Sequence, residues 1–159
     1  MRALVVDRLA PGYGGVSVRD VDTPTPGPGE VRVAVRAAAV NFPDLLMTRG
    51  EYQHKPALPF VGGLEMSGDI DAVGAGVTAW CVGDAVVGGT RTGTFCEHVV
   101  APATGLRAKP ARLSYAEAAS YGAAYLTAYV SLVRRARVEP GEWDALIAEL
   151  EDTAERVDG

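Results

Sequence analysis

The sequence predicts a mainly β domain followed by helices, and three observations support this fold class. Nineteen glycines and ten prolines lie mostly before residue 111, a distribution typical of short strands joined by turns. In the same part of the chain, Val31, Val33 and Val35 alternate with polar or small residues, which is the period of a half-buried strand. After Ser114 the chain becomes rich in alanine and poor in proline, which indicates helices.

The strands are predicted from short runs of apolar and β-branched residues bounded by turn residues. A strand at 3–6 and another at 16–19 are expected to form a hairpin, since glycine and proline between 11 and 15 favour a turn. The segment 23–29 lacks a backbone donor at each of its three prolines and is expected to be a surface loop. Further strands are predicted at residues 31–36, 67–73, 85–87 and 95–101.

A short helix is predicted between Asn41 and Gly50. The side-chain oxygen of Asn41 can cap the first free N–H groups, and Pro43 and Asp44 suit the first turn. Gly50 can end the helix in a left-handed conformation. Residues 51–54 then form an irregular segment, and loops on a rigid scaffold are where functional residues tend to lie.

The helical part begins at Ser114, where Ser114 and Glu117 have the spacing of a capping box. We expect an alanine-rich helix that is interrupted near Gly122, and a second helix over about residues 123–137. From Trp143 apolar residues recur at helical spacing, which predicts an amphipathic tail helix.

Composition excludes several classes of function. The net charge of −5 argues against a nucleic-acid partner, which requires clustered lysine and arginine. No apolar run approaches the roughly 18 residues of a membrane span, and the N-terminus does not have the pattern of a signal peptide. Cys81 and Cys96 make no disulfide framework. The sequence therefore predicts a cytoplasmic protein with reduced thiols.

Two motifs that suggest cofactors are explained by local structure. Residues 74–79 match the loose G-x-G-x-x-A pattern of dinucleotide sites, but only three residues separate them from Gly83. That spacing leaves no room for the helix that the motif requires, so a β-turn is predicted. On the predicted strand, Cys96 and His98 face one way and Glu97 the other, so these three residues are not expected to bind zinc jointly. Hydrolase chemistry is not indicated either, and His98 and His54 are expected to be surface or structural residues.

The chain resembles the medium-chain dehydrogenases/reductases, and within them the zinc-independent quinone oxidoreductases and enoyl reductases. The resemblance covers roughly residues 1–142 and rests on the segments NFPD, RGEYQ, PALPFVGGLEMSG, DAVGAGVTAWCVGDAVVG, TFCEHVVAP and AAYLTAYVSLVRRARVEPGE. It implies a GroES-like, partly open β-barrel followed by C-terminal helices. Residues 1–113 would form the GroES-like catalytic domain and 114–142 the helices that lead into a nucleotide-binding domain, while the tail at 143–159 has no family match.

The resemblance also implies that zinc is not used. Asn41 stands where the zinc-dependent branch has its first cysteine, and Leu64 stands where that branch has a histidine. The four-cysteine structural lobe is missing. Glu65 aligns with a glutamate near the metal of that branch, and without metal it is expected to bind backbone N–H groups or an arginine, because a buried carboxylate needs partners.

The resemblance assigns roles to three residues. Tyr52 corresponds to a tyrosine that assists protonation of the substrate after hydride addition, and a phenol can donate a proton to a developing enolate; the alternative is an aromatic residue that only lines the pocket. Asn41 and Thr127 would approach the nicotinamide end of NADPH. Their alternatives are a helix cap for Asn41 and an ordinary helix-side hydroxyl for Thr127.

By this resemblance, the chain is the substrate-side domain of an NADPH-dependent oxidoreductase that reduces a quinone, enone or enoyl substrate by hydride transfer. The family's nucleotide-binding domain does not follow the segment that ends at Glu142, so the chain is expected to be truncated, inactive alone, and to bind NADPH weakly or not at all. The first alternative is a GroES-like binding module for a small apolar ligand or a protein partner. The second is one half of a split reductase that is completed in trans, and a homodimer is also possible.

Overall fold

The computed structural model describes residues 1–139 and 142, which group into two compact units. The first unit is Met1–Ala123 and the second begins at Ala124. The predicted tail helix from Trp143 lies outside the described residues.

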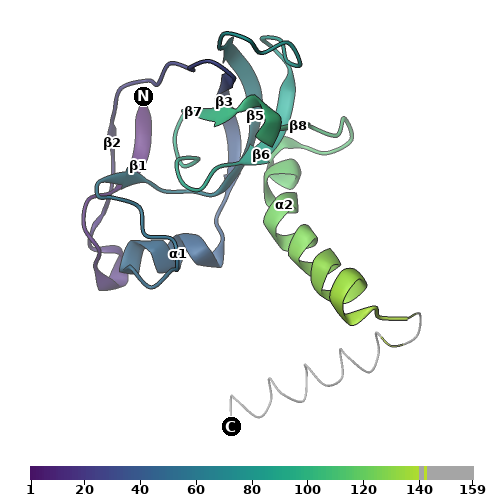
Figure 1. Cartoon of the computed structure of the whole chain (residues 1–159). Helices are drawn as coiled ribbons and strands as arrows, with labels where there is room; N and C mark the ends of the chain where they lie inside the picture. The colour runs from purple at the N-terminus through teal and green to yellow at the C-terminus, as the bar shows by residue number, and fades with distance from the viewer. Residues whose placement is uncertain (140–141, 143–159) are drawn as a thin grey trace. The chain divides into compact units, whose positions relative to one another are not determined.

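The first unit contains two antiparallel sheets (Figure 1). The smaller sheet has the order β2-β1-β4, and the larger has the order β7-β3-β5-β6-β8. The strands of the smaller sheet are β1 (Arg2–Val6), β2 (Val16–Asp20) and β4 (Phe60–Val61). Those of the larger sheet are β3 (Glu30–Ala39), β5 (Glu65–Val73), β6 (Ala85–Gly89), β7 (His98–Pro102) and β8 (Arg107–Ala108).

The two sheets meet at the N-terminal strand without closing into a barrel. The backbone N–H of Leu4 donates to the carbonyl of Phe95 over 2.9 Å, and Ala3 forms an isolated bridge with Cys96. The partly open β architecture predicted from the sequence is therefore confirmed.

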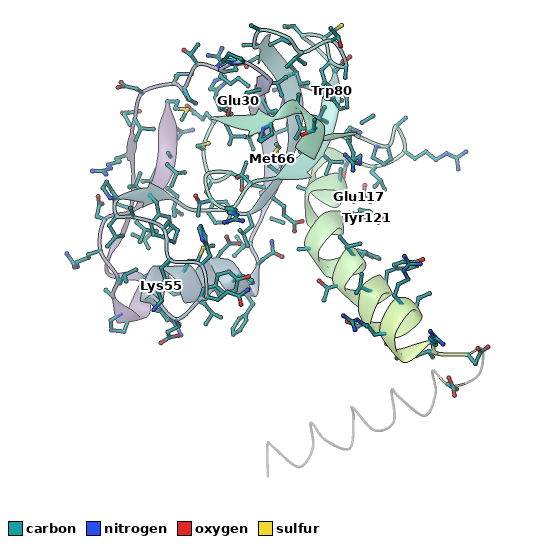
Figure 2. All side chains as sticks on the ribbon, viewed as in Figure 1. Glu30, Lys55, Met66, Trp80, Glu117 and Tyr121 are labelled. Atoms are coloured by element: carbon teal, nitrogen blue, oxygen red, sulfur yellow. The ribbon has the colours of Figure 1, made fainter. Side chains whose placement is uncertain are left out.

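The main core lies on one face of the larger sheet. Val31 and Val33 of β3 are completely buried, whereas Arg32 faces the other way and pairs with Asp71 at 2.8 Å. This is the alternation that the sequence predicted. Met66 lies among the strands of this sheet (Figure 2), and the other buried members of the cluster are Ile70, Val86, Val99, Ala101 and Leu106.

Helix α1 (Phe42–Arg49) follows β3 and ends as predicted. Gly50 has a φ of 74°, and its N–H bonds back to the last turn of the helix. Met47 of α1 forms a second, smaller core cluster with Val6 and Phe60. Helix α1 therefore packs against the smaller sheet, while its first residue directly follows the end of the larger one.

The glycine-rich segment after β5 forms the predicted turn. The N–H of Val77 points to the carbonyl of Gly74 over 3.4 Å, and Gly76 has a φ of 79°. The chain then returns to the sheet as β6, and no helix separates the two strands.

Several predicted boundaries were wrong. The strand predicted at 95–101 begins only at His98, because Phe95 and Cys96 bond to β1 of the other sheet instead. The two-residue strands β4 and β8 were not predicted. The short 3-10 turns are η1 (Pro11–Tyr13) and η2 (Ala103–Gly105).

The predicted interruption near Gly122 was also wrong. Helix α2 runs without a break over Tyr115–Tyr129, and its capping box is present, with Ser114 and Glu117 bonded reciprocally at 2.8 and 3.2 Å. A π-helix, η3 (Val130–Ala136), follows and ends at Arg137, whose φ is 55°. Gly122 therefore does not break the helix, and the reason for a glycine at this position is found in the candidate site described below.

Candidate functional site

The polar centre of the candidate site is the pair Asn41 and Glu65. Asn41 is the N-cap of α1 and Glu65 is the first residue of β5, so the pairing of β3 with β5 brings them together. The side-chain nitrogen of Asn41 donates to Oε1 of Glu65 over 3.0 Å. The other carboxylate oxygen, Oε2, accepts the backbone N–H of Ala123 over 2.8 Å. The expectation that Glu65 binds a backbone N–H group is therefore confirmed.

A second buried carboxylate lies on the other side of Asn41. Oδ2 of Asp44 accepts the backbone N–H of Asn41 over 2.8 Å, which is the return bond of a capping box. Burial raises the pKa of Asp44, the N–H of Asn41 partly opposes this, and the nearby Glu65 adds to the rise. Asn41 is thus held through its backbone by one carboxylate and through its side chain by another.

Gly122 is explained by the position of Glu65. A Cβ at position 122 would lie 2.8 Å from Oε2 of Glu65, closer than real Cβ contacts. Glycine inside a helix costs about 1 kcal/mol relative to alanine. Here the missing side chain is what allows the carboxylate to reach the helix backbone.

Tyr52 lies in the irregular segment between α1 and Pro56 and is partly buried. Its ring packs against the small core cluster formed by Val6, Met47 and Phe60. Among the described residues, its hydroxyl has no hydrogen-bond partner. The ring is therefore held by packing, and its role as a proton donor remains a prediction.

Thr127 belongs to the second compact unit, where it is an exposed residue of α2. Its predicted approach to a nicotinamide ring remains a prediction. The site within the first unit consists of Asn41, Glu65 and Asp44, while Tyr52 packs against the small core cluster that includes Met47 of α1.

Exposed apolar side chains flank Asn41. Val40 and Phe42, its two neighbours in the chain, are 68% and 71% exposed. A fixed amide between exposed apolar groups can hold a flat ring that carries a polar substituent.

The residues of the Cys96–His98 segment have separate partners. The thiol of Cys96 contacts the carbonyls of Gly93 and His98, while Glu97 pairs with Arg2 and His98 lies 2.8 Å from Asp71. Burial raises the pKa of Cys96 to about 11, so the thiolate that a metal would need is disfavoured. Within residues 1–139 and 142, no group of three or more His, Cys, Asp or Glu side chains could hold a metal ion.

None of the helices in the described part of the chain is long and apolar enough to span a lipid bilayer.

Comparison with known proteins gives consistent matches. The model of the alcohol dehydrogenase GroES-like domain matches residues 27–111. A quinone oxidoreductase-like protein 2 homolog of Nematostella vectensis is 43% identical over 117 residues, which are 73% of this chain and 32% of that protein. The human synaptic vesicle membrane protein VAT-1 homolog is 35% identical over 143 residues, covering 89% and 36% of the two chains.

Solved structures share the fold. The quinone oxidoreductase of Thermus thermophilus, which was also solved in complex with NADPH, superposes with a TM-score of 0.75 and is 32% identical, over 89% of this chain and 43% of that one. A probable oxidoreductase from Mycobacterium abscessus superposes with a TM-score of 0.82 and is 37% identical, over 89% and 44%. The chain spans about a third of the length of the curated relatives that it matches.

Proposed function

The chain belongs to the alcohol dehydrogenase GroES-like domain family, in the medium-chain dehydrogenases/reductases, and on this basis we propose that it forms the substrate side of an NADPH-dependent reductase site. The reaction is hydride transfer from the nicotinamide to a quinone or an enone. The family consists of oxidoreductases. We propose in addition that NADPH is the cofactor, that a quinone or an enone is the substrate, and that the residues have the roles given below.

The observation that carries this proposal is the setting of Asn41. Its amide is bonded to Glu65, and its two neighbours in the chain, Val40 and Phe42, expose their apolar side chains. Nicotinamide and quinone rings are flat and apolar and carry polar oxygen or amide groups, so both suit such a surface. The exposure of Val40 and Phe42 is not explained by the core, because core residues of these types are buried.

NADPH would supply the hydride, and this chain would contribute only part of its binding site. In the proposal, Asn41 and Thr127 lie near the nicotinamide. In the described residues, no glycine-rich turn opens a helix, the arrangement that binds a pyrophosphate. The phosphates would therefore be bound by further residues of the same protein or by a partner chain.

Tyr52 would supply the proton. Hydride addition to an enone leaves an enolate oxygen, and a neutral phenol can donate a proton to it. A quinone asks less of such a donor, because the hydroquinone anion can be protonated by water. We therefore expect Tyr52→Phe to slow enone reduction about ten-fold more than quinone reduction.

The test exchanges domains with a relative that binds NADPH. The chain replaces the corresponding N-terminal residues of the Thermus quinone oxidoreductase, and oxidation of NADPH by 1,4-benzoquinone and by an enone is followed at 340 nm. We expect turnover by the chimera, and a loss of about ten-fold or more in kcat/KM for Asn41→Ala. The proposal is contradicted if the chimera binds NADPH, as judged by cofactor fluorescence, but neither Asn41→Ala nor Tyr52→Phe changes its turnover. Thermal stabilisation of the 159-residue chain by the quinone without any effect of NADPH would favour the binding module instead.

A further inference from the structure

We propose that Glu65 is a positioning residue, which locks the amide of Asn41 in one orientation by anchoring it to the backbone of α2 at Ala123. The consequence for function rests on the reductase site proposed above, whereas the lock itself can be tested without any ligand. The lock is formed by the two carboxylate oxygens of Glu65, next to Gly122.

Both oxygens of Glu65 act as acceptors. Oε2 accepts the backbone N–H of Ala123 at 2.8 Å, and Oε1 accepts the side-chain nitrogen of Asn41 at 3.0 Å. Only 8% of Glu65 is exposed, so water cannot readily replace either partner. A buried carboxylate with a backbone donor on one side requires another donor on the other side.

This requirement fixes the side chain of Asn41. An asparagine amide has one end that donates and one that accepts, and its NH2 end must face Glu65. Its oxygen then lies on the capping-box side, toward the start of α1, where the backbone N–H of Asp44 donates to the main-chain carbonyl of Asn41 over 3.0 Å. Rotation of the amide by half a turn would place an oxygen against a carboxylate. Asn41 therefore has a single favourable orientation.

Gly122 is the residue that permits the lock. The atom that a Cβ at this position would meet is Oε2 of Glu65, at 2.8 Å, with nothing else within 4 Å. Since Oε2 is at the end of a flexible side chain, an alanine at 122 would displace the carboxylate and leave the helix intact. Alanine is also a better helix former than glycine. Gly122→Ala should therefore release Asn41 while the helix persists, at a cost in stability that reflects the lost partners of the buried Glu65 carboxylate.

A polarity exchange gives a second, independent test. In Glu65→Gln, the new amide must present its oxygen to the N–H of Ala123, so its NH2 faces the NH2 of Asn41, and the bond of the wild-type orientation is lost. Adding Asn41→Asp restores a donor–acceptor pair, now with the NH2 on Gln and the acceptor on Asp, and aspartate is also a good N-cap. Asn41→Asp alone places two carboxylates against each other. The double variant should thus behave more like the wild type than either single variant does.

The experiment follows side-chain NH2 groups by ¹⁵N NMR on the full 159-residue chain without ligand. In the wild type, the NH2 of Asn41 should exchange with solvent slowly, and Glu65→Gln and Gly122→Ala should each accelerate this exchange about ten-fold. In the double variant, the NH2 introduced at position 65 should be protected by the aspartate, while in Glu65→Gln alone the NH2 of Asn41 should lose its protection. Gly105→Ala is the matched control for the glycine, because nothing lies within 4 Å of its Cβ position, and Asp22→Asn is the control for removal of an exposed carboxylate.

Unchanged exchange of the Asn41 amide in both Glu65→Gln and Gly122→Ala would overturn the proposal. NADPH titration of the same variants in the chimera with the Thermus quinone oxidoreductase tests the proposed function separately. A working lock together with an NADPH affinity of the chimera that no variant changes would sink the proposed function and leave this inference standing.

Discussion

Gly74 and Gly76 begin the segment that matches a dinucleotide-binding pattern, and their separate replacement by alanine tests what these glycines do. A Cβ at Gly74 would lie 1.9 Å from the carbonyl oxygen of Gly27 and 2.8 Å from that of Glu30. A Cβ at Gly76 would meet nothing within 4 Å, but the residue has a φ of 79°. The first glycine allows two backbone segments to approach, and the second allows a left-handed conformation.

The two costs can be worked out from these contacts. A carbon and a carbonyl oxygen approach no closer than about 3.3 Å, so Gly74→Ala must move the neighbouring loop by about 1.4 Å. Overpacking of this kind costs about 2 kcal/mol, and loss of the bond from Gly74 N–H to Glu30, now 2.8 Å long, adds about 1 kcal/mol. Gly76→Ala carries only the left-handed strain, about 1 kcal/mol. We expect losses of about 3 and about 1 kcal/mol respectively.

The measurement is urea unfolding at pH 7, followed by tryptophan fluorescence, with the m-value as the check that both variants unfold like the wild type. Equal losses for Gly74→Ala and Gly76→Ala would refute the packing argument. If the two glycines instead served a phosphate, both variants would lose NADPH affinity at little cost in stability, which is the opposite pattern.

Three further predictions concern hydrogen bonding, the core and the thiols. Tyr115→Phe removes the hydroxyl that donates to Asp69, and this bond, together with Arg36, lowers the pKa of Asp69. The substitution should cost about 1 kcal/mol of stability at pH 7. The cost should become smaller as the pH falls through the lowered pKa of Asp69, because the carboxylate is then protonated in wild type and variant alike. Ile70→Ala, at a residue that is 1% exposed, should cost about 3 kcal/mol in urea unfolding. Because Cys81 is exposed while burial raises the pKa of Cys96 to about 11, a disulfide reagent at pH 8 should modify one thiol in the folded chain and both in denaturant.

Each of these predictions has a result that would contradict it. For Tyr115→Phe it is a loss of stability that stays constant between pH 7 and pH 3. For Ile70→Ala it is a change no larger than that of Val18→Ala, since Val18 is 69% exposed. For the thiols, rapid modification of both cysteines in the folded chain would show that Cys96 is not protected.

The sequence predicted the elements whose signals are local. The N-cap at Asn41, the left-handed Gly50 and the capping box at Ser114 each depend on a few neighbouring residues, and all three are present. The turn at 74–78 was predicted from spacing alone, because three residues cannot hold a crossover helix.

The elements that the sequence did not predict depend on distant partners. Strands β4 and β8 have two residues each, too few for any periodicity, and exist only because β1 and β6 lie beside them. Phe95 and Cys96 have the composition of a strand that continues into β7, yet they bond to β1. Strand propensity indicates that a segment is extended but does not say which sheet it joins.

The candidate site was predicted only in part, again because it depends on residues that are distant in the sequence. Asn41 and Glu65 were singled out, and the backbone bond of Glu65 was anticipated. Gly122 was interpreted as a helix break, because the sequence gives no sign that a carboxylate 57 positions earlier lies against that helix. A glycine inside an otherwise alanine-rich helix was the available signal, and a close approach rather than a break is its cause.

The bond between β1 and the segment at Phe95 also sets the order in which this domain can form during synthesis. Arg2 donates to the side chain of Glu97, 95 residues further along the chain. At ribosomal rates of about 5–20 residues per second, the first strand waits roughly 5–20 s before that partner has been made. During this time the first half of one edge of β1 is free, whereas its hairpin with β2 and its short pairing with β4 can already form. The strand that is synthesised first is therefore among the last to be enclosed, and conditions that slow translation should lengthen the period in which a nascent chain exposes it.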